Sequence, residues 1–219
     1  MKPLPATSAA LRVTAPARLH LGFLDLNGSL GRRYGSIGMA IDRPSTQLTI
    51  SRADENSAIG AENRRVLKLL RKFTDDGRTG SYTVDVAHAI PAHAGLGSGT
   101  QLALAVGAAI ARLEGQHLSA ADLAALGERG ARSGIGLEAF ISGGFIVDGG
   151  KGTSDHPPPV TLRTDFPVNW RVMLILDPSF TGVSGEAETT AFADLPPFPD
   201  SQAAHICRLV LMKLVPGLK

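Results

Sequence analysis

A glycine-rich run over residues 90–101 constrains this chain more than any other feature, because it joins a strand-like segment to a helix-like one. Gly80–Ala89 resembles a strand, the run reads IPAHAGLGSGTQ, and the Ala- and Leu-rich stretch Leu102–Leu113 follows. Three glycines within five positions open the backbone to close approach, and Ser98 or Thr100 is expected to cap the helix. Unpaired N–H groups at a helix start favour an anion. The run therefore predicts a phosphate-binding loop; the alternative is a tight turn that merely starts a buried helix.

Two better-known glycine loops do not fit the run. No lysine follows the glycines, which excludes the Walker type of phosphate loop. Gly95, Gly97 and Gly99 alternate with other residues instead of following G-x-G-x-x-G, so no dinucleotide site is implied.

The composition limits the class of protein. Of the 219 residues, 43% are hydrophobic, which is enough to form the core of one large domain or of two small ones. With 22 basic and 20 acidic residues the net charge is only +2, which argues against nucleic acid as the main partner. Cys207 is the single cysteine, so no intramolecular disulfide forms and a cytoplasmic location is expected, with Cys207 as a buried structural thiol. No apolar run approaches the length of a membrane span.

Periodicity predicts the other elements. Strands are expected at 11–24, 35–42 and 46–52, with a turn at 43–45 between the last two. Two short strands are expected within 138–148. A further strand, the most clearly buried one, is expected at 169–176. Helices are expected at 56–73, 119–130 and 201–214, with Ser119 as an N-cap. Pro16 predicts a bend or bulge in the first strand.

The helix expected at 56–73 carries five basic residues. They are Arg64, Arg65, Lys68, Arg71 and Lys72, beside an apolar stripe of Val66, Leu69, Leu70 and Phe73. Such a row is compatible with nucleic-acid binding, but no aromatic residues interleave with it. A solvated helix face is the favoured interpretation.

The glycine run resembles the second motif of the GHMP kinase superfamily, P-x-x-x-G-L-G-S-S, with Gly99 in place of the second serine. The segment Ala15–Gly22 resembles the first motif of that family. The resemblance implies an α/β two-layer sandwich with a mixed sheet and helices on one face. It also implies that the loop wraps phosphates, through the residues Pro91, Gly95, Leu96, Gly97, Ser98, Gly99 and Thr100.

The same resemblance predicts the domain organisation. Residues 1–176 correspond to the N-terminal domain of the superfamily, and residues 177–219 to the start of a C-terminal domain that is largely missing. No third glycine motif follows Asp177, so a truncated chain is expected.

One departure points to a branch of the superfamily. Kinase members carry a catalytic Asp in a loop of the form S-G-x-D, and here Gly136 takes that place; glycine accepts no proton. The segments 17–25, 34–41 and 132–150 resemble the β-ribofuranosylaminobenzene 5'-phosphate synthase family instead. That resemblance implies condensation of phosphoribosyl pyrophosphate with 4-aminobenzoate or 4-hydroxybenzoate, loss of CO₂ and pyrophosphate, and a place in tetrahydromethanopterin biosynthesis.

Four residues are candidates for the chemistry. Arg18 would stabilise the diphosphate leaving group, and His20, on the same face of the strand, would position or deprotonate the substituent of the aromatic acid. Asp25 would help to hold Mg²⁺ or the ribose, or would only form a turn. Glu138 would replace the missing Asp, or would only be an exposed residue of an edge strand. Arg32 is a further anion ligand, and His93 a loop-exposed spectator.

Three functions stay open at this point. The first is the synthase, with Mg²⁺ on the diphosphate; no structural or catalytic zinc motif is present. The second is a small-molecule kinase that binds ATP with the same loop. The third is a non-catalytic module that binds a phosphate ligand. Homodimerisation is compatible with all three and has no residue to support it.

Overall fold

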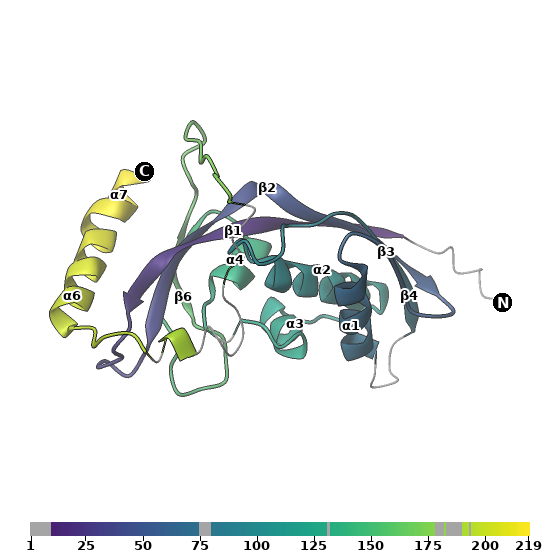
Figure 1. The fold of residues 1–219 in the computed structure, drawn as a ribbon, viewed down its shortest axis with the longest axis horizontal. Coiled ribbons are helices and arrows are strands. Elements are labelled where there is room, and N and C mark those ends of the chain that lie inside the picture. Colours follow the sequence, from purple (N-terminus) through teal and green to yellow (C-terminus); the bar gives the residue numbers. More distant parts are fainter. Residues whose placement is uncertain (1–9, 75–79, 131, 178–181, 183–189, 193) are drawn as a thin grey trace.

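The computed structural model describes residues 10–74, 80–130, 132–177, 182, 190–192 and 194–219 and is built on one mixed, six-stranded sheet (Figure 1). The strands are β1 (Leu11–Asp25), β2 (Tyr34–Ala53), β3 (Ser57–Gly60), β4 (Ser81–His88), β5 (Phe145–Asp148) and β6 (Val160–Thr164). The helices are α1 (Asn63–Thr74), α2 (Ser98–Leu113), α3 (Ala120–Leu126), α4 (Ile135–Ile141) and α6 (Asp200–Leu209), which continues through η1 (Val210–Leu214) into α7 (Val215–Gly217).

The long strand β2 organises the sheet. β1 runs antiparallel to it along one edge. On the other edge, residues 47–53 of β2 pair with β4, and residues 36–39 pair with β5. β3 joins β4 in parallel, while β6 joins β5 antiparallel. The sheet is therefore mixed, as predicted.

The sequence interpretation divided β2 at the wrong place. A turn was expected at 43–45, but β2 continues through these residues and bends. Pro16 faces Ser45 while Ala17 faces Ile41, so the register shifts at this point. Proline has no N–H to donate to the ladder, and three extra residues of β2 bulge out opposite it. The irregularity predicted at Pro16 is confirmed, and the partner strand β2 bends opposite it.

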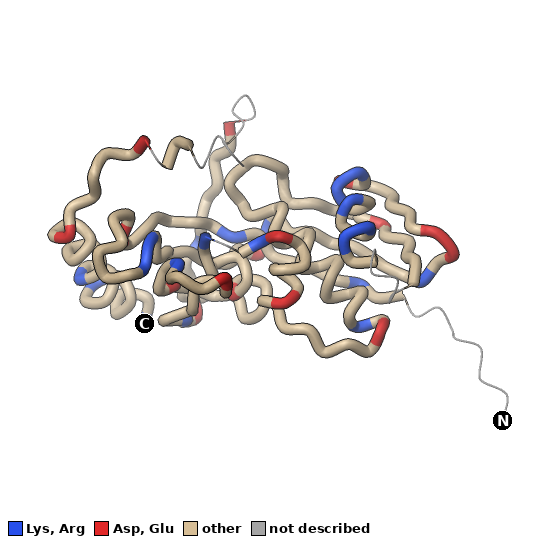
Figure 2. The backbone as a smooth tube through the Cα atoms, turned by 90° about the horizontal axis from the view of Figure 1, so that it is seen from below, with Lys and Arg blue, Asp and Glu red and all other residues tan. Residues whose placement is uncertain are grey.

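The main core lies between the sheet and a layer of four helices, α1 to α4 (Figure 1). The apolar stripe of α1 is buried as predicted, and its other side carries Lys and Arg (Figure 2). α2 is the central helix of this layer, with every residue from Gln101 to Gly107 buried. α3 begins at the predicted N-cap, Ser119, with a complete capping box.

The C-terminal helix covers part of the other face of the sheet. Val210 and Leu218 pack on Met39 of β2 and Phe145 of β5. The next residue of each of these strands points to the opposite face of the sheet, toward α4. Burial raises the pKa of the Cys207 thiol on this helix, and the charge of Asp25 raises it further. A raised pKa lowers the thiolate fraction, which fits a structural thiol, but Cys207 is only half-buried and not buried as predicted.

Two element predictions are wrong because an apolar pattern was assigned to the wrong period. The helix expected from residue 56 begins at Asn63, and Ser57–Gly60 pairs with β4 as β3. The segment expected as two strands forms α4 and then β5. Ile135 and Ala139 lie one helical turn apart and face Ile146 in a small buried cluster, so tertiary packing selected the helix.

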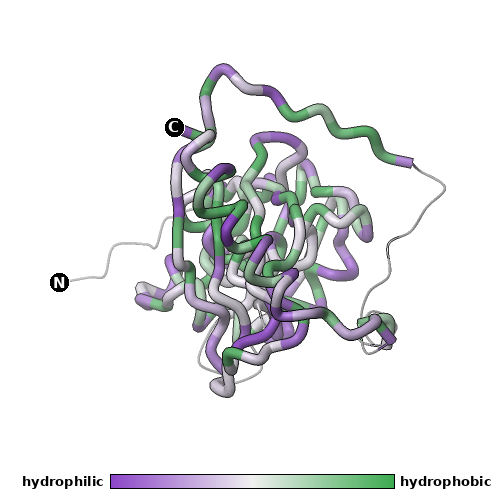
Figure 3. The backbone as a smooth tube through the Cα atoms, turned by 90° about the vertical axis from the view of Figure 1, so that its left-hand side faces the viewer, coloured by the Kyte–Doolittle hydropathy of each residue, from purple (hydrophilic) through white to green (hydrophobic). Residues whose placement is uncertain are grey.

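Residues 169–176, expected as the most clearly buried strand, form no strand. Met173 is 83% exposed and Ile175 is 89% exposed. In Figure 3 this apolar stretch stands away from the body of the molecule. Leu174 alone packs inward, against the cluster of Ala17, Ile90 and Leu96. A strand forms only where a neighbour supplies hydrogen bonds, and none of the described strands does so here. The domain boundary at 176/177 stays a prediction.

No helix within the described ranges is long and apolar enough to cross a membrane.

Candidate functional site

The glycine run forms a loop that exposes the start of α2. Gly95 and Gly97 have φ values of +73° and +78°, the left-handed region that glycine enters without strain. Gly97 occupies the N-cap position, and no side chain caps the helix there; the capping role expected of Ser98 or Thr100 is therefore wrong. The first N–H groups of α2 have no acceptor within the helix, so they can bind an anion.

Arg18 lies directly against this loop. Its Nη1 donates to the carbonyl oxygen of Gly95 at 2.6 Å, and its backbone N–H donates to Leu96 at 3.1 Å. A Cβ placed on Gly97 would lie 2.9 Å from Cγ of Arg18 and 3.0 Å from Nε. Only glycine leaves room here for the arginine, which brings a fixed positive charge to the open helix start.

Asp148 holds a second loop beside the first. Its carboxylate is fully buried. Oδ1 accepts the N–H groups of Ser36 and Gly150 at 3.1 and 3.0 Å, and Oδ2 accepts the hydroxyl of Ser133 and the N–H of Gly134, both at 2.9 Å. Four donors around one carboxylate fix the start of α4 against β2 and β5.

The start of α4 in turn contacts the start of α2. A Cβ placed on Gly136 would lie 3.2 Å from Cγ2 of Thr100. The side-chain amide of buried Gln101 donates to the carbonyl oxygen of Gly136 at 2.7 Å. The family resemblance predicts an Asp of the kinases at this position, and here an added side chain would press on Thr100 of α2.

A row of aromatic rings follows β1 away from the glycine loop. The His20 and Phe23 rings lie 4.5 Å apart between centroids. Phe23 contacts Tyr34 at 5.8 Å and Phe192 at 5.3 Å, the latter edge to face. The guanidinium of Arg132, two residues before Gly134, lies 5.3 Å from the Phe192 ring centroid, in cation–π contact. The row therefore ends next to the loop that Asp148 holds.

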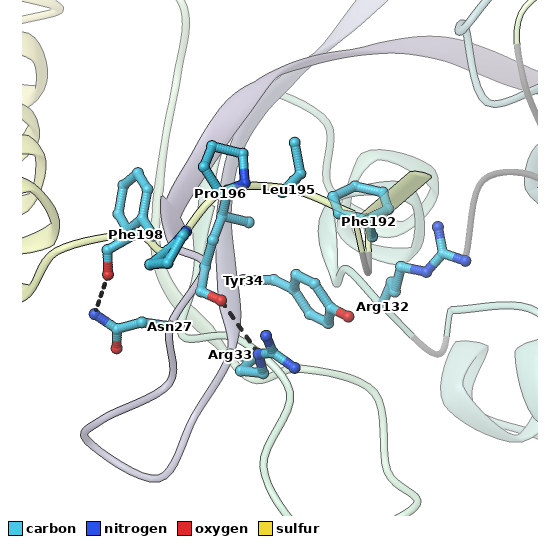
Figure 4. A pocket seen from close by; sticks show the side chains of 10 residues that line it. Asn27, Arg33, Tyr34, Arg132, Phe192, Leu195, Pro196 and Phe198 are labelled. Carbon is cyan, nitrogen blue, oxygen red and sulfur yellow. Dashed lines mark hydrogen bonds between the residues drawn. The ribbon is translucent and has the colours of Figure 1, made fainter. Parts of the chain in front are cut away.

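Tyr34 and Phe192 of this row line a pocket of about 660 Å³, here called the aromatic pocket. Its lining residues are Leu26, Asn27, Arg33, Tyr34, Arg132, Phe192, Leu195, Pro196, Pro197 and Phe198 (Figure 4). In Figure 4 the Tyr34 ring lies across the pocket between Arg33 and Phe192, with its hydroxyl toward Arg132. Flat apolar walls with two guanidinium groups suit a planar aromatic anion.

The structure separates the four predicted catalytic residues. Arg18 contacts the glycine loop, and His20 starts the aromatic row. Asp25 lies at the far end of β1, roughly 20 Å along the strand from Arg18. Its Oδ1 accepts the N–H groups of Asn27 and Gly28, so it forms the turn that the sequence left as an alternative. Glu138 lies on α4, not on the expected edge strand, and does not line the aromatic pocket.

The remaining predicted residues have clear places. Leu96 is buried and anchors the glycine loop on Ala17 and Ile90, whereas Pro91 is exposed at its beginning. His93 is exposed, as expected. Arg32 donates to the carbonyl oxygens of Gly149 and Gly150 at 2.8 and 2.9 Å, so it fastens a loop.

Sequence reasoning assigned no role to Tyr34, Arg132 or Phe192. They come from three segments far apart in the chain, and only the fold brings them together. The sole signal was indirect: Tyr34 and Arg132 lie in segments that carry the family resemblance.

Comparisons with known proteins identify the family of this chain. Residues 63–144 match the family described as GHMP kinases N terminal domain. The chain is 35% identical over 222 residues to beta-ribofuranosylphenol 5'-phosphate synthase of Archaeoglobus fulgidus, covering 95% of this chain and 70% of the relative. It is 34% identical over 236 residues to the protein of the same name from Methanocaldococcus jannaschii, covering 94% and 71%.

A solved structure shows the same fold. Homoserine kinase from Cytophaga hutchinsonii superposes with a TM-score of 0.58 and 19% identity, over 98% of this chain and 69% of that one.

Replacing Asp148 by Asn tests the anchor of the second loop. The Asn amide turns one acceptor into a donor that faces two existing donors, so we expect the free energy of unfolding in urea to fall by about 3 kcal/mol. Asp155→Asn, at an exposed position, should stay within about 0.5 kcal/mol of the unaltered chain. Equal effects of the two substitutions would contradict this role of Asp148.

Proposed function

This chain belongs to the beta-ribofuranosylphenol 5'-phosphate synthase family of the GHMP superfamily, and on that premise we propose that it condenses phosphoribosyl pyrophosphate with 4-hydroxybenzoate. The relatives are named for a phenol product, which favours the hydroxyl-bearing acid over 4-aminobenzoate. The observation that carries the proposal is a phosphate-type loop with an arginine against it, and a row of aromatic rings that leads from there along β1 to a pocket of aromatic and guanidinium groups.

The loop suits the donor substrate. Pyrophosphate leaves with the electron pair of the bond from C1 of the ribose to its oxygen, so negative charge builds up on the diphosphate. N–H groups of Ser98, Gly99 and Thr100 and the guanidinium of Arg18 would stabilise that charge.

The aromatic pocket suits the acceptor. The ring of the acid would lie against Tyr34 and Phe192, with its carboxylate toward Arg33 or Arg132. The ring carbon that bears the carboxylate forms the new bond to C1. The bond to the carboxylate carbon then breaks, CO₂ leaves, and the electron pair restores the aromatic ring.

No net proton transfer is needed in this reaction, because the departing CO₂ returns its electron pair to the ring. A base that takes the phenol proton to raise the electron density of the ring must therefore give it back. We assign that role to His20, whose ring contacts Phe23 at the start of the aromatic row, although His20 does not itself line the aromatic pocket.

Mg²⁺ is proposed as the counter-ion of the diphosphate. In such sites it keeps several waters and binds substrate phosphates with one or two carboxylates. Asp25, the carboxylate expected to help hold the ion, does not fit this role, because it lies roughly 20 Å along β1 from Arg18 and forms a turn there. The phosphates of the substrate and water would hold the ion instead. The ion would neutralise charge on the leaving group. The reducing cytoplasm is the proposed compartment, given the single cysteine.

The kinase alternative is disfavoured by the packing at residue 136. An Asp there would press on Thr100, and the glycine leaves no base for a substrate hydroxyl. The non-catalytic alternative has no specific observation in its favour.

Calorimetry on the full chain with Mg²⁺ tests the donor site. We expect phosphoribosyl pyrophosphate to bind more tightly than ATP, and Gly97→Asp to weaken it about 100-fold, because the new side chain displaces Arg18 and repels the diphosphate. Gly115→Asp is the matched control: Gly115 follows the C-cap residue of α2, has φ +67° and has no atom within 4 Å of an added Cβ.

Tighter binding of ATP would contradict the synthase proposal. Equal weakening by both substitutions would show that the loss comes from backbone strain and not from the loop.

The acceptor site is tested by Phe192→Ala. Losing its edge contacts with Phe23 and Tyr34 should raise KM for 4-hydroxybenzoate about 10-fold and leave KM for phosphoribosyl pyrophosphate within about twofold. Phe166→Ala removes a similar ring contact, with Trp170, away from this pocket and should change neither constant. A rise only in the KM of the donor would contradict the assignment.

A further inference from the structure

A second concave site lies on the other side of the glycine loop, here called the cationic pocket. It has a volume of about 280 Å³ and is lined by Arg65, Lys68, Leu69, Lys72, Gly99, Leu102, Gly127, Glu128 and Arg129. Its basic residues come from α1, whose Lys and Arg positions are stacked along the helix in Figure 2, and from the turn after α3. Four cations from two elements thus meet at the second residue of α2.

Gly99 is the point where the two elements meet. A Cβ placed on it would lie 3.1 Å from Nη2 of Arg65 and 3.4 Å from Cζ of Arg129. Two guanidinium groups therefore flank one glycine whose backbone N–H belongs to the open start of α2. Like charges held this close repel each other, and an anion between them would remove that repulsion.

The carboxylates nearby neutralise only part of this charge. Arg65 pairs with Glu62 at 3.0 Å, and Lys72 pairs with Glu128. Lys68 and Arg129 form no ion pair within the described ranges. Four cations against two carboxylates leave an excess of two positive charges, which matches one phosphate dianion.

The position of the pocket changes the interpretation of the basic stripe on α1. The sequence suggested a solvated helix face, but Arg65 and Lys72 are only 34% and 27% exposed in their side chains and face the phosphate-type loop. A small concave site with a glycine floor suits one small anion. Leu69 and Leu102 are its only large apolar lining residues, so it offers little surface to a purine.

We infer that the cationic pocket is a second phosphate subsite of the phosphoribosyl donor, with Arg65 and Arg129 as its ligands. This inference rests on the proposed function. The donor carries phosphate groups at both ends of its ribose, and the loop with Arg18 takes part of this charge. The phosphate bound in the pocket is one of two groups of the donor. It is either the 5'-phosphate, which is an ester, or the terminal phosphate of the diphosphate, which is part of an anhydride.

Calorimetry with separate probes tests the subsite. Phosphoribosyl pyrophosphate, ribose 5-phosphate and pyrophosphate are each titrated into the unaltered full chain and into Arg65→Gln and Arg129→Gln. We expect both substitutions to weaken phosphoribosyl pyrophosphate at least about 10-fold. Of the two smaller probes, the one that weakens in parallel identifies the phosphate group that the pocket binds.

The controls separate charge from folding. Arg64→Gln removes an exposed cation from the neighbouring position of α1 and should leave all three affinities within about twofold. Arg129→Lys keeps the charge and should retain most of the affinity.

Two failures can be told apart. If the unaltered chain binds no phosphoribosyl pyrophosphate, the proposed function fails and the subsite with it. If it binds this donor and Arg65→Gln and Arg129→Gln behave like Arg64→Gln, the subsite is overturned and the proposed function stands.

Discussion

The buried carboxylate of Asp148 is the constraint on which the rest of the site depends. It gathers donors from β2, from the segment before α4 and from the residues after β5. Because this side chain is fully buried, the loss of any of these donors would leave a buried polar oxygen without a partner. The start of α4 is therefore fixed, and with it the contact between Gly136 and Thr100. Arg132, two residues before Gly134, is positioned at the aromatic pocket by the same anchor.

Three glycines around the start of α2 share one purpose, which is to let another group approach the backbone. Gly97 leaves room for Arg18, Gly136 for Thr100, and Gly99 for the arginines of the cationic pocket. The result is a surface of N–H groups and guanidinium groups, where kinase relatives would bring a carboxylate. In the proposed reaction such a surface would bind a polyanion and stabilise a departing one, and it has no base at Gly136 to activate a hydroxyl.

The parts that could be predicted from the sequence are those that lie contiguously in it. The glycine loop, α2, the buried stripe of α1 and the bend at Pro16 follow from local patterns. The uninterrupted course of β2 could not be predicted from local patterns, because its bend depends on the partner strand. The aromatic pocket could not be predicted either, because residues from three distant segments build it. Residues 169–176 have the pattern of a strand, yet no described strand pairs with them.

In the proposed reaction, carbon–carbon bond formation at the ribose goes together with loss of the carboxylate. The most direct measurement follows labelled CO₂ released from carboxyl-labelled 4-hydroxybenzoate, together with pyrophosphate, when the full chain is supplied with phosphoribosyl pyrophosphate and Mg²⁺. We expect equal amounts of both products, and none when either substrate is omitted. Formation of ADP from ATP with a phosphorylated acceptor, and no CO₂ release, would contradict it.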